Sequence, residues 1–212
     1  MSATMLEPRT SSPFAASAPD DVIDATAAAL RARGFEVRIA EDRAQARDLA
    51  LELIPNGSEV NQASSKTIDE LGIGDAIVER DEYVALKPTL WSMDRATQGK
   101  QIRQIGSAPE VMIGSAHAIT ADGQIVSASM SGSQLSAYAG GAGKVVYVVG
   151  SQKLVPDLDT AFQRIEDYVF PLEDARAQAA YGVHSAINKV LIVRGDMPGR
   201  TAVVLVKDAI GF

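Results

Sequence analysis

The run Lys144–Val149, KVVYVV, limits the possible folds of this chain more than any other stretch. It is short, continuous in β-branched and aromatic residues after its first position, and bounded by Gly143 and Gly150. A strand with one face in water alternates apolar and polar residues, so this run predicts a strand that is covered on both faces. Strands of this kind occur in parallel sheets between two layers of other structure.

Helical and strand-like patterns alternate along the rest of the chain. Helices are predicted at 20–32, 42–53, 134–142, 157–168 and 172–181. Strands are predicted at 35–39, 58–61, 111–113, 124–128, 189–193 and 200–206. This alternation predicts an α/β fold, with a Rossmann-like, mostly parallel sheet and helices on both faces.

Three local patterns predict one further helix and two hairpins. Residues 83–105, which contain the only Trp and several cations, predict a helix across one end of the domain. Asp122-Gly123 predicts a hairpin turn before the strand 124–128. The loop 195–199 predicts a second hairpin, which would add the last two strands as an antiparallel edge of the sheet.

The length and composition predict one large domain. The 212 residues are 46% apolar and 22% charged, the usual balance of a chain that buries a sizeable core. Residues 1–19 are rich in Ser, Ala, Thr and Pro and lack any periodicity. We therefore expect a disordered or loosely ordered tail at 1–19 and a domain at 20–212.

Composition also argues against several classes of function. The net charge is −7 and the chain has no basic cluster, which argues against nucleic-acid binding. The absence of cysteine excludes disulfides, thiolate catalysis and iron–sulfur clusters held by this chain. Neither a long apolar run nor a secretory leader is found, so we expect no membrane span and a cytoplasmic location.

Polar loops follow several predicted strands at their carboxyl ends. Ser115 and His117 come after one strand, and Lys153 comes after the central one. A further loop offers Ser131, Gly132, Ser133 and Gln134. The carboxyl ends of parallel strands meet at one edge of an open sheet, where ligands bind. We therefore expect a site for a small anion at this edge, with Lys153 neutralising the ligand; the alternative is a solvated lysine that caps carbonyl groups.

A second hydroxyl-rich stretch opens the helix that follows the strand 58–61. Its candidate ligand-binding residues are Asn61, Ser64, Ser65 and Lys66. Free N–H groups and the dipole at a helix N-terminus can hold an anion. The serines can equally act as helix caps, and the sequence leaves both interpretations open.

Histidine is the other chemically informative residue type. Only His117 and His184 are present, each in a loop beside a strand, and we expect both to line one pocket. Histidine serves as a general acid or base near neutral pH, although a hydrogen-bonded structural histidine is the alternative. A zinc site lacks a third ligand, and the dinucleotide, phosphate-loop and nucleophile-elbow motifs are absent. We predict no metal and no cofactor.

Several stretches of the chain together resemble a known family. They are ASSKTIDELG (63–72), GSAHAITADGQIV (114–126), SGSQLSAYAGGAGKVVYVVGSQKLVPDLDTAFQRI (131–165), FPLEDARAQAAYGVHSAINKVLIV (170–193) and LVKDAIGF (205–212). In order and spacing they resemble the lactate-utilisation (LUD) domain family, and within it the short lactate-utilisation protein C-like members. The resemblance implies the NagB/RpiA/CoA transferase-like fold. It also implies a role in oxidising L-lactate to pyruvate, beside iron–sulfur oxidoreductase subunits.

Part of the chain is also similar to ribose-5-phosphate isomerase. Asn61–Thr67 resembles its phosphate loop, Ser131–Ala137 its glycine-rich loop, and Lys153 the lysine of its SKLV motif. Where the isomerase has catalytic acids in a DGADE stretch, this chain has Gly114–Ala118. Because both carboxylates are missing, His117 is the only candidate base at that place.

Three functional hypotheses follow. The leading one is a protein of the lactate-utilisation type that binds a small anionic ligand. The second is a sugar-phosphate or carboxylate isomerase or transferase that uses His117 as acid and base. The third is a non-catalytic assembly or regulatory module that binds iron–sulfur subunits. The sequence leaves the oligomeric state open, a homo-oligomer included.

Overall fold

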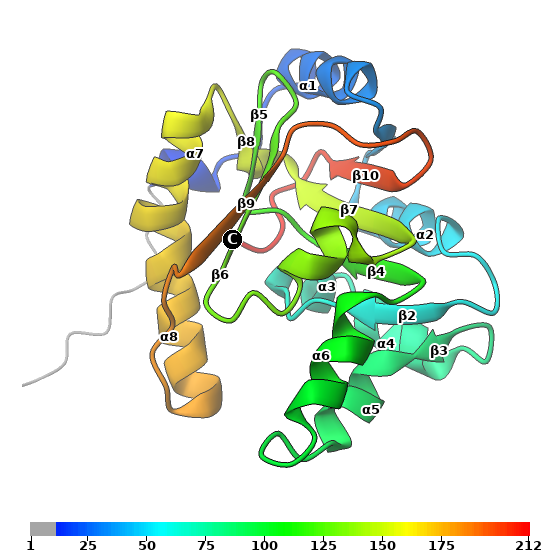
Figure 1. Cartoon of the computed structure of the whole chain (residues 1–212). Coiled ribbons are helices and arrows are strands. Elements are labelled where there is room, and N and C mark those ends of the chain that lie inside the picture. Colours follow the sequence, from blue (N-terminus) through cyan, green and yellow to red (C-terminus); the bar gives the residue numbers. More distant parts are fainter. Residues whose placement is uncertain (1–11) are drawn as a thin grey trace, which may run out of the picture.

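The main element of the fold is a six-stranded, entirely parallel sheet in the order β1-β10-β7-β4-β2-β3 (Figure 1). The structure is a computed structural model and describes residues 12–212. The strands of this sheet are β1 (Glu36–Ala40), β2 (Glu59–Gln62), β3 (Val84–Ala85), β4 (Val111–Gly114), β7 (Lys144–Gly150) and β10 (Thr201–Val206). The predicted α/β fold with a mostly parallel sheet is confirmed.

Both faces of the main sheet are covered, as the sequence of β7 predicts. Val146 and Val148 face a core that is shared with α2 (Arg43–Glu52), α3 (Lys66–Glu70) and α4 (Ile73–Glu79). Val145 and Val149 face a second core, which contains α1 (Asp20–Ala32) and residues of a smaller sheet. Alternate residues of the continuous apolar run in β7 thus pack into the two cores on opposite faces of the sheet.

The smaller sheet has the order β8-β5-β6-β9 and was not predicted from the sequence. Its strands are β5 (Ala118–Thr120), β6 (Ile125–Ser129), β8 (Leu154–Val155) and β9 (Lys189–Val193). The hairpin at Asp122-Gly123 is confirmed, but it joins β6 to the unpredicted strand β5. The far side of this sheet packs on a long helical segment (Figure 1). That segment consists of α7 (Leu158–Arg164), the π-type turn η4 (Ile165–Val169) and α8 (Phe170–Tyr181).

The predicted hairpin between the last two strands is wrong. β9 pairs antiparallel with β6, whereas β10 lies between β1 and β7 and is parallel to both. The loop 195–199 therefore connects two different sheets. All six residues of β10 are buried, which suits a central strand, whereas β9 is partly exposed at an edge.

Two predicted helices also differ from the structure. The segment predicted as one helix at 83–105 instead contains β3, α5 (Leu86–Ser92) and α6 (Gly99–Ser107). The two helices are separate because Asp94 accepts hydrogen bonds from Ala96 and Thr97 in a turn between them. Residues 134–142 form only a short helical turn that ends in η2 (Ala137–Gly141). A Cβ atom at Gly141 would collide with the carbonyl oxygen of Ser107, so this turn packs directly on α6.

Residues 12–19, which the sequence assigns to a loosely ordered tail, lie against the domain. They contain the 3-10 turn η1 (Pro13–Ala15), and the Phe14 ring packs on Tyr168 with centroids 6.3 Å apart. The backbone N–H of Ala18 donates to Ser151 Oγ at 3.1 Å. Residues 1–11 lie outside the described part, and the domain boundary at residue 20 stays a prediction. Among the described residues, no helix combines the length and apolar character needed to cross a membrane.

Candidate functional site

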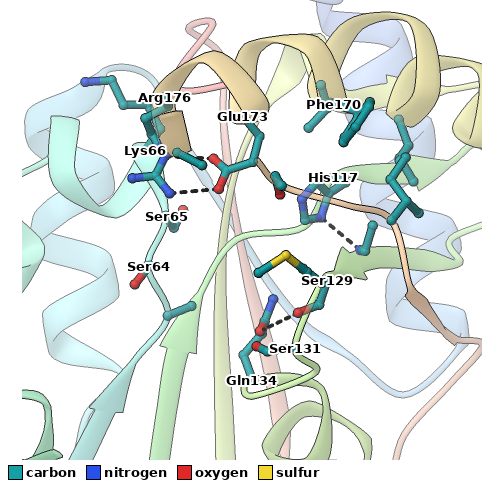
Figure 2. Close-up of a pocket in the computed structure, with 18 of the residues that line it drawn as sticks. Ser64, Ser65, Lys66, His117, Ser129, Ser131, Gln134, Phe170, Glu173 and Arg176 are labelled. Carbon is teal, nitrogen blue, oxygen red and sulfur yellow. Dashed lines mark hydrogen bonds and ion pairs between the residues drawn. The ribbon is translucent and has the colours of Figure 1, made fainter. Parts of the chain in front are cut away.

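A pocket of about 270 Å³ lies at the carboxyl ends of β2, β4 and β7. Figure 2 shows Glu173 and Arg176 of α8 on one side of it, with Ser129, Ser131 and Gln134 on the other. Ten of the twelve predicted site residues line this pocket: Ser64, Ser65, Lys66, Ser115, His117, Ser131, Ser133, Gln134, Lys153 and His184. Loops that are far apart in the sequence meet here because parallel strands end at the same edge.

Lys153 lies at the base of the pocket and is 1% exposed, so it is neither a solvated lysine nor a side chain that extends over the edge. The turn η3 (Ser151–Lys153) follows β7 directly and directs the side chain inward. Its Nζ lies 2.8 Å from Thr67 Oγ1 and 3.2 Å from Ser115 Oγ. Burial, and then the charge of Arg164, hold the pKa of Lys153 well below the ordinary value of a lysine.

Arg164 is a second buried cation close to the site. It is 0% exposed, and its guanidinium donates to the carbonyl groups of Gln152 and His117. Its Nη2 has no hydrogen-bond partner within the described part of the chain, and burial lowers the pKa of Arg164 to about 10. Among residues 12–212, neither Lys153 nor Arg164 forms an ion pair with a carboxylate.

His117 presents one of its two ring nitrogens to the backbone. Its Nδ1 accepts a hydrogen bond from the N–H of Ala128 at 3.1 Å, which assigns the proton of the neutral ring to Nε2. Burial, followed by the charges of Lys153 and Arg164, lowers the pKa of His117 to about 3. At neutral pH the ring is therefore uncharged and can donate one hydrogen bond through Nε2.

The serine-rich loop after β6 is held by its own hydrogen bonds. Ser129 Oγ accepts from the N–H of Gly132 at 2.9 Å and lies 3.1 Å from Gln134 Oε1. Gly132 itself does not line the pocket. Its φ of +81° and the Lys189 side chain 2.8 Å from a would-be Cβ show why glycine is required in this turn.

Asn61 is the other predicted residue that stays outside the pocket. It is buried in β2, and its side-chain amide donates to the carbonyl of Gly106 at 3.3 Å. This contact ties β2 to the end of α6. The structure therefore gives Asn61 a place in packing rather than on the surface of the pocket.

Ser64, Ser65 and Lys66 form the rim of the pocket beside β2. Ser65 occupies the N-cap position of α3, but its side chain makes no capping hydrogen bond. α3 contains only five residues, so its dipole contributes little, and any role of this rim depends on the side chains. The Nζ of Lys66 is 3.9 Å from Glu70 Oε1, a long contact that leaves the ammonium free for other partners.

α8 supplies pocket residues that the sequence reasoning missed. Arg176 and Glu173 form a two-pronged ion pair with both N–O distances at 2.7 Å. That contact raises the pKa of Arg176 above its ordinary value. The i,i+3 spacing of the two residues predicts the ion pair, but only the fold places α8 over the pocket.

His184 lines the rim with a side chain that is 75% exposed. Its Nδ1 lies 3.0 Å from the carboxylate of Asp174 and its Nε2 2.7 Å from Gln178. Both histidines thus reach one pocket, as expected. They differ in environment, because His117 is held by the backbone at the base and His184 by side chains at the edge.

The comparisons with known proteins agree with this architecture. The family model of the LUD domain matches residues 23–206. The chain belongs to the LUD domain family. The LUD domain described here is also similar to the crystal structure of a DUF162 family protein from Deinococcus radiodurans, with a TM-score of 0.56 and 10% identity. That match covers 88% of this chain and 96% of the other, and at this identity it supports the fold alone. Among proteins with curated functions, none matches this LUD domain.

Proposed function

We propose that this LUD domain binds a small anionic ligand in the pocket at the carboxyl edge of the main sheet. The observation that carries the proposal is the pair of buried cations, Lys153 and Arg164, neither of which has an ion-pair partner among the described residues. Burying a positive charge without a partner costs free energy. A ligand anion beside Lys153 would supply the missing negative charge and offset that cost.

The other polar groups of the pocket suit the same ligand. Ser64, Ser65 and Lys66 would bind the anion from the β2 side, and Ser131, Ser133 and Gln134 would close the opposite wall. Among the described side chains that line the pocket, Glu173 carries the only carboxylate, and it is already paired with Arg176. The Nε2–H of His117 would donate to a ligand oxygen. Charge-assisted hydrogen bonds of this kind are stronger than neutral ones.

Membership of the LUD family adds a metabolic context to the proposal. We infer a protein of the lactate-utilisation type, whose ligand is a small carboxylate such as L-lactate or pyruvate and which works beside iron–sulfur subunits. The chain has no cysteine, so such clusters would belong to a partner. Purification from lactate-grown cells tests this inference, and a chain that is recovered without any iron–sulfur protein would contradict it.

A thermal-shift panel tests the binding proposal itself. The purified protein is screened against L-lactate, pyruvate, sugar phosphates, CoA esters, nucleotides and folates. A ligand at 100 times its Kd stabilises the folded protein by about 2.7 kcal/mol, so a specific anion raises the melting temperature. We expect the shift to disappear in Lys153→Met. A shift of the same size in that variant, shown by circular dichroism to be folded, would contradict the assigned role of Lys153.

The two alternative functions make different predictions. An isomerase or transferase that uses His117 as a base requires a ring that takes up a proton, and a pKa of about 3 makes that ring a weak base. The environment of His117 therefore favours hydrogen-bond donation to the ligand. A His117→Ala variant that lost turnover but retained affinity for the ligand would instead favour the isomerase or transferase. The assembly or regulatory module predicts partner binding that is unchanged in Lys153→Met.

A further inference from the structure

Ser115 and Lys153 form a close pair that anion binding alone does not explain. Ser115 follows β4 directly, lines the pocket and is partly exposed to it. Its Oγ lies 3.2 Å from Nζ of the buried Lys153. A hydroxyl within hydrogen-bond reach of a basic group, at a strand end in a pocket, is the arrangement of an activated nucleophile.

The hydrogen bonds around Lys153 orient its amine toward Ser115. The hydroxyl of Thr67 donates to the carbonyl of Ile210 at 3.3 Å, so its oxygen accepts a hydrogen bond from Lys153 Nζ at 2.8 Å. In this structure the Ser115 hydroxyl donates to the carbonyl of Ala116 at 3.3 Å and accepts from Lys153 at 3.2 Å. When Lys153 is neutral, rotation of that hydroxyl lets it donate to the lone pair of Lys153 Nζ instead. Burial and the nearby Arg164 lower the pKa of Lys153 and favour this neutral form.

Two further donors lie in the same pocket. The hydroxyl of Tyr138 is buried directly against Gly114, where a Cβ atom would collide with it, and it has no hydrogen-bond partner among residues 12–212. The Nε2 of His117 carries the second free proton. Hydrogen-bond donors that face the reacting carbonyl group can stabilise the negative charge that develops on its oxygen.

We propose that Ser115 is a nucleophile and Lys153 its general base, in acyl transfer from a small ester or thioester. Ser115 Oγ bonds to the carbonyl carbon while its proton passes to Lys153 Nζ. The bond to the leaving alcohol or thiol then breaks, and Lys153 returns the proton to that group. Water then attacks the acyl-serine while its proton passes to Lys153 Nζ. The bond to Ser115 Oγ breaks, Lys153 returns the proton to that oxygen, and a carboxylic acid is released.

This activity goes beyond the proposed function and agrees with it. Hydrolysis yields a carboxylate, which is the kind of small anion that the pocket is proposed to bind. With that anion present, Lys153 is held as an ammonium, and without it the amine serves as a base. Anion binding does not require the acyl step, so the two proposals can fail separately.

A small alkyl fluorophosphonate tests the pair. Ser115 Oγ would attack phosphorus and expel fluoride, leaving a stable adduct that intact mass and peptide mapping locate. We expect one adduct per chain, on Ser115, absent in Ser115→Ala and unchanged in the control Ser92→Ala, whose hydroxyl lies outside the pocket. In Lys153→Met the labelling rate should fall by about 100-fold, the usual contribution of a general base.

Two results would overturn the proposal. The first is a wild-type chain that is not labelled at Ser115 although a carboxylate still raises its melting temperature, which would leave the proposed anion binding intact. The second is equal labelling in wild type and Lys153→Met. If that variant does not fold, the pH dependence of wild-type labelling decides. A rate that rises with pH to a plateau below the ordinary pKa of lysine supports the base, and a flat profile contradicts it.

Discussion

At the scale of single residues, the burial of Lys153 at the base of the pocket comes at a cost to stability. The side chain is fully buried, and two hydroxyl oxygens lie within hydrogen-bond distance of its Nζ, whereas no carboxylate of the described residues pairs with it. A core built only for stability would place an apolar side chain here. The conflict between local stability and residue choice is expected at functional sites.

We therefore expect Lys153→Met to stabilise the ligand-free protein. Methionine fills a similar volume without a desolvation penalty, which outweighs the lost hydrogen bonds to Thr67 and Ser115. At pH 7 the free energy of unfolding should rise by about 1 kcal/mol, as measured by urea denaturation.

The pH dependence of the same variant provides the control. The folded-state pKa of Lys153 is lowered, so the unfolded chain binds more protons and wild-type stability rises with pH toward the ordinary pKa of lysine. Lys153→Met should lack this rise. A variant that is less stable at pH 7 and keeps the wild-type slope would contradict the account of Lys153.

At the scale of elements, α8 is the part of the fold that covers the pocket. Ala177 is its only buried residue, so α8 is held mainly through its continuation into η4 and α7. Arg164 anchors that segment through the carbonyl groups of Gln152 and His117. The same helical segment therefore positions the base of the pocket and supplies its roof.

Substitutions at the two residues of the ion pair on α8 test whether this helix contacts the bound anion. Arg176→Gln should weaken binding of an anion found in the panel by about 10-fold, because it removes a cation from the pocket. Glu173→Gln should strengthen binding, because it frees Arg176 to meet the ligand. Isothermal titration calorimetry measures both affinities.

The ion pair is partly exposed, so neither change should alter stability by more than about 1 kcal/mol. Opposite effects on affinity with similar melting temperatures are the expected pattern. Equal affinities in the two variants would show that α8 covers the pocket without contacting the anion.

At the scale of the whole molecule, two sheets share one continuous core. The cluster that contains α1 joins residues of the main sheet to Ile119 and Ile125 of the smaller sheet. Ionisable groups that are buried near this junction have different pKa values in the folded and unfolded states, so their titration changes the stability of the domain. The pH dependence of unfolding is therefore a property of the entire fold.

We expect acid destabilisation that depends on His117. Its pKa falls from an ordinary 6.5 to about 3 on folding, so the unfolded chain binds more protons in this window. The contribution of neutral His117 is complete above pH 6.5 and is lost as the pH falls toward 3. The loss approaches about 1.4 kcal/mol per pH unit within the window.

Asn at position 117 provides the control for this prediction. Its side-chain oxygen can still accept from the Ala128 N–H, but the side chain does not titrate. Urea denaturation from pH 7 to pH 4 should give a shallower decline of stability for His117→Asn than for wild type. Identical declines would assign acid sensitivity to carboxyl groups instead.

Local patterns in the sequence identified much of this fold and the edge of the sheet that carries the pocket. The apolar run of β7, the helices α1 and α2, and the turn at Gly123 are short-range features that side-chain periodicity and turn chemistry encode directly. The polar loops that line the pocket follow strand ends, so a parallel sheet alone predicts that they meet. The order of the family motifs identified the LUD domain.

Tertiary structure decided the features that depend on partners far along the chain. β10 is central and β9 belongs to another sheet, because strand pairing is non-local and adjacent strands in sequence need not pair. The burial of Lys153, the anchoring contacts of Arg164 and the placement of Arg176 over the pocket likewise arise only from packing. Periodicity reports which face of an element is buried, whereas the neighbours of a buried charge are set by elements that the local sequence does not contain.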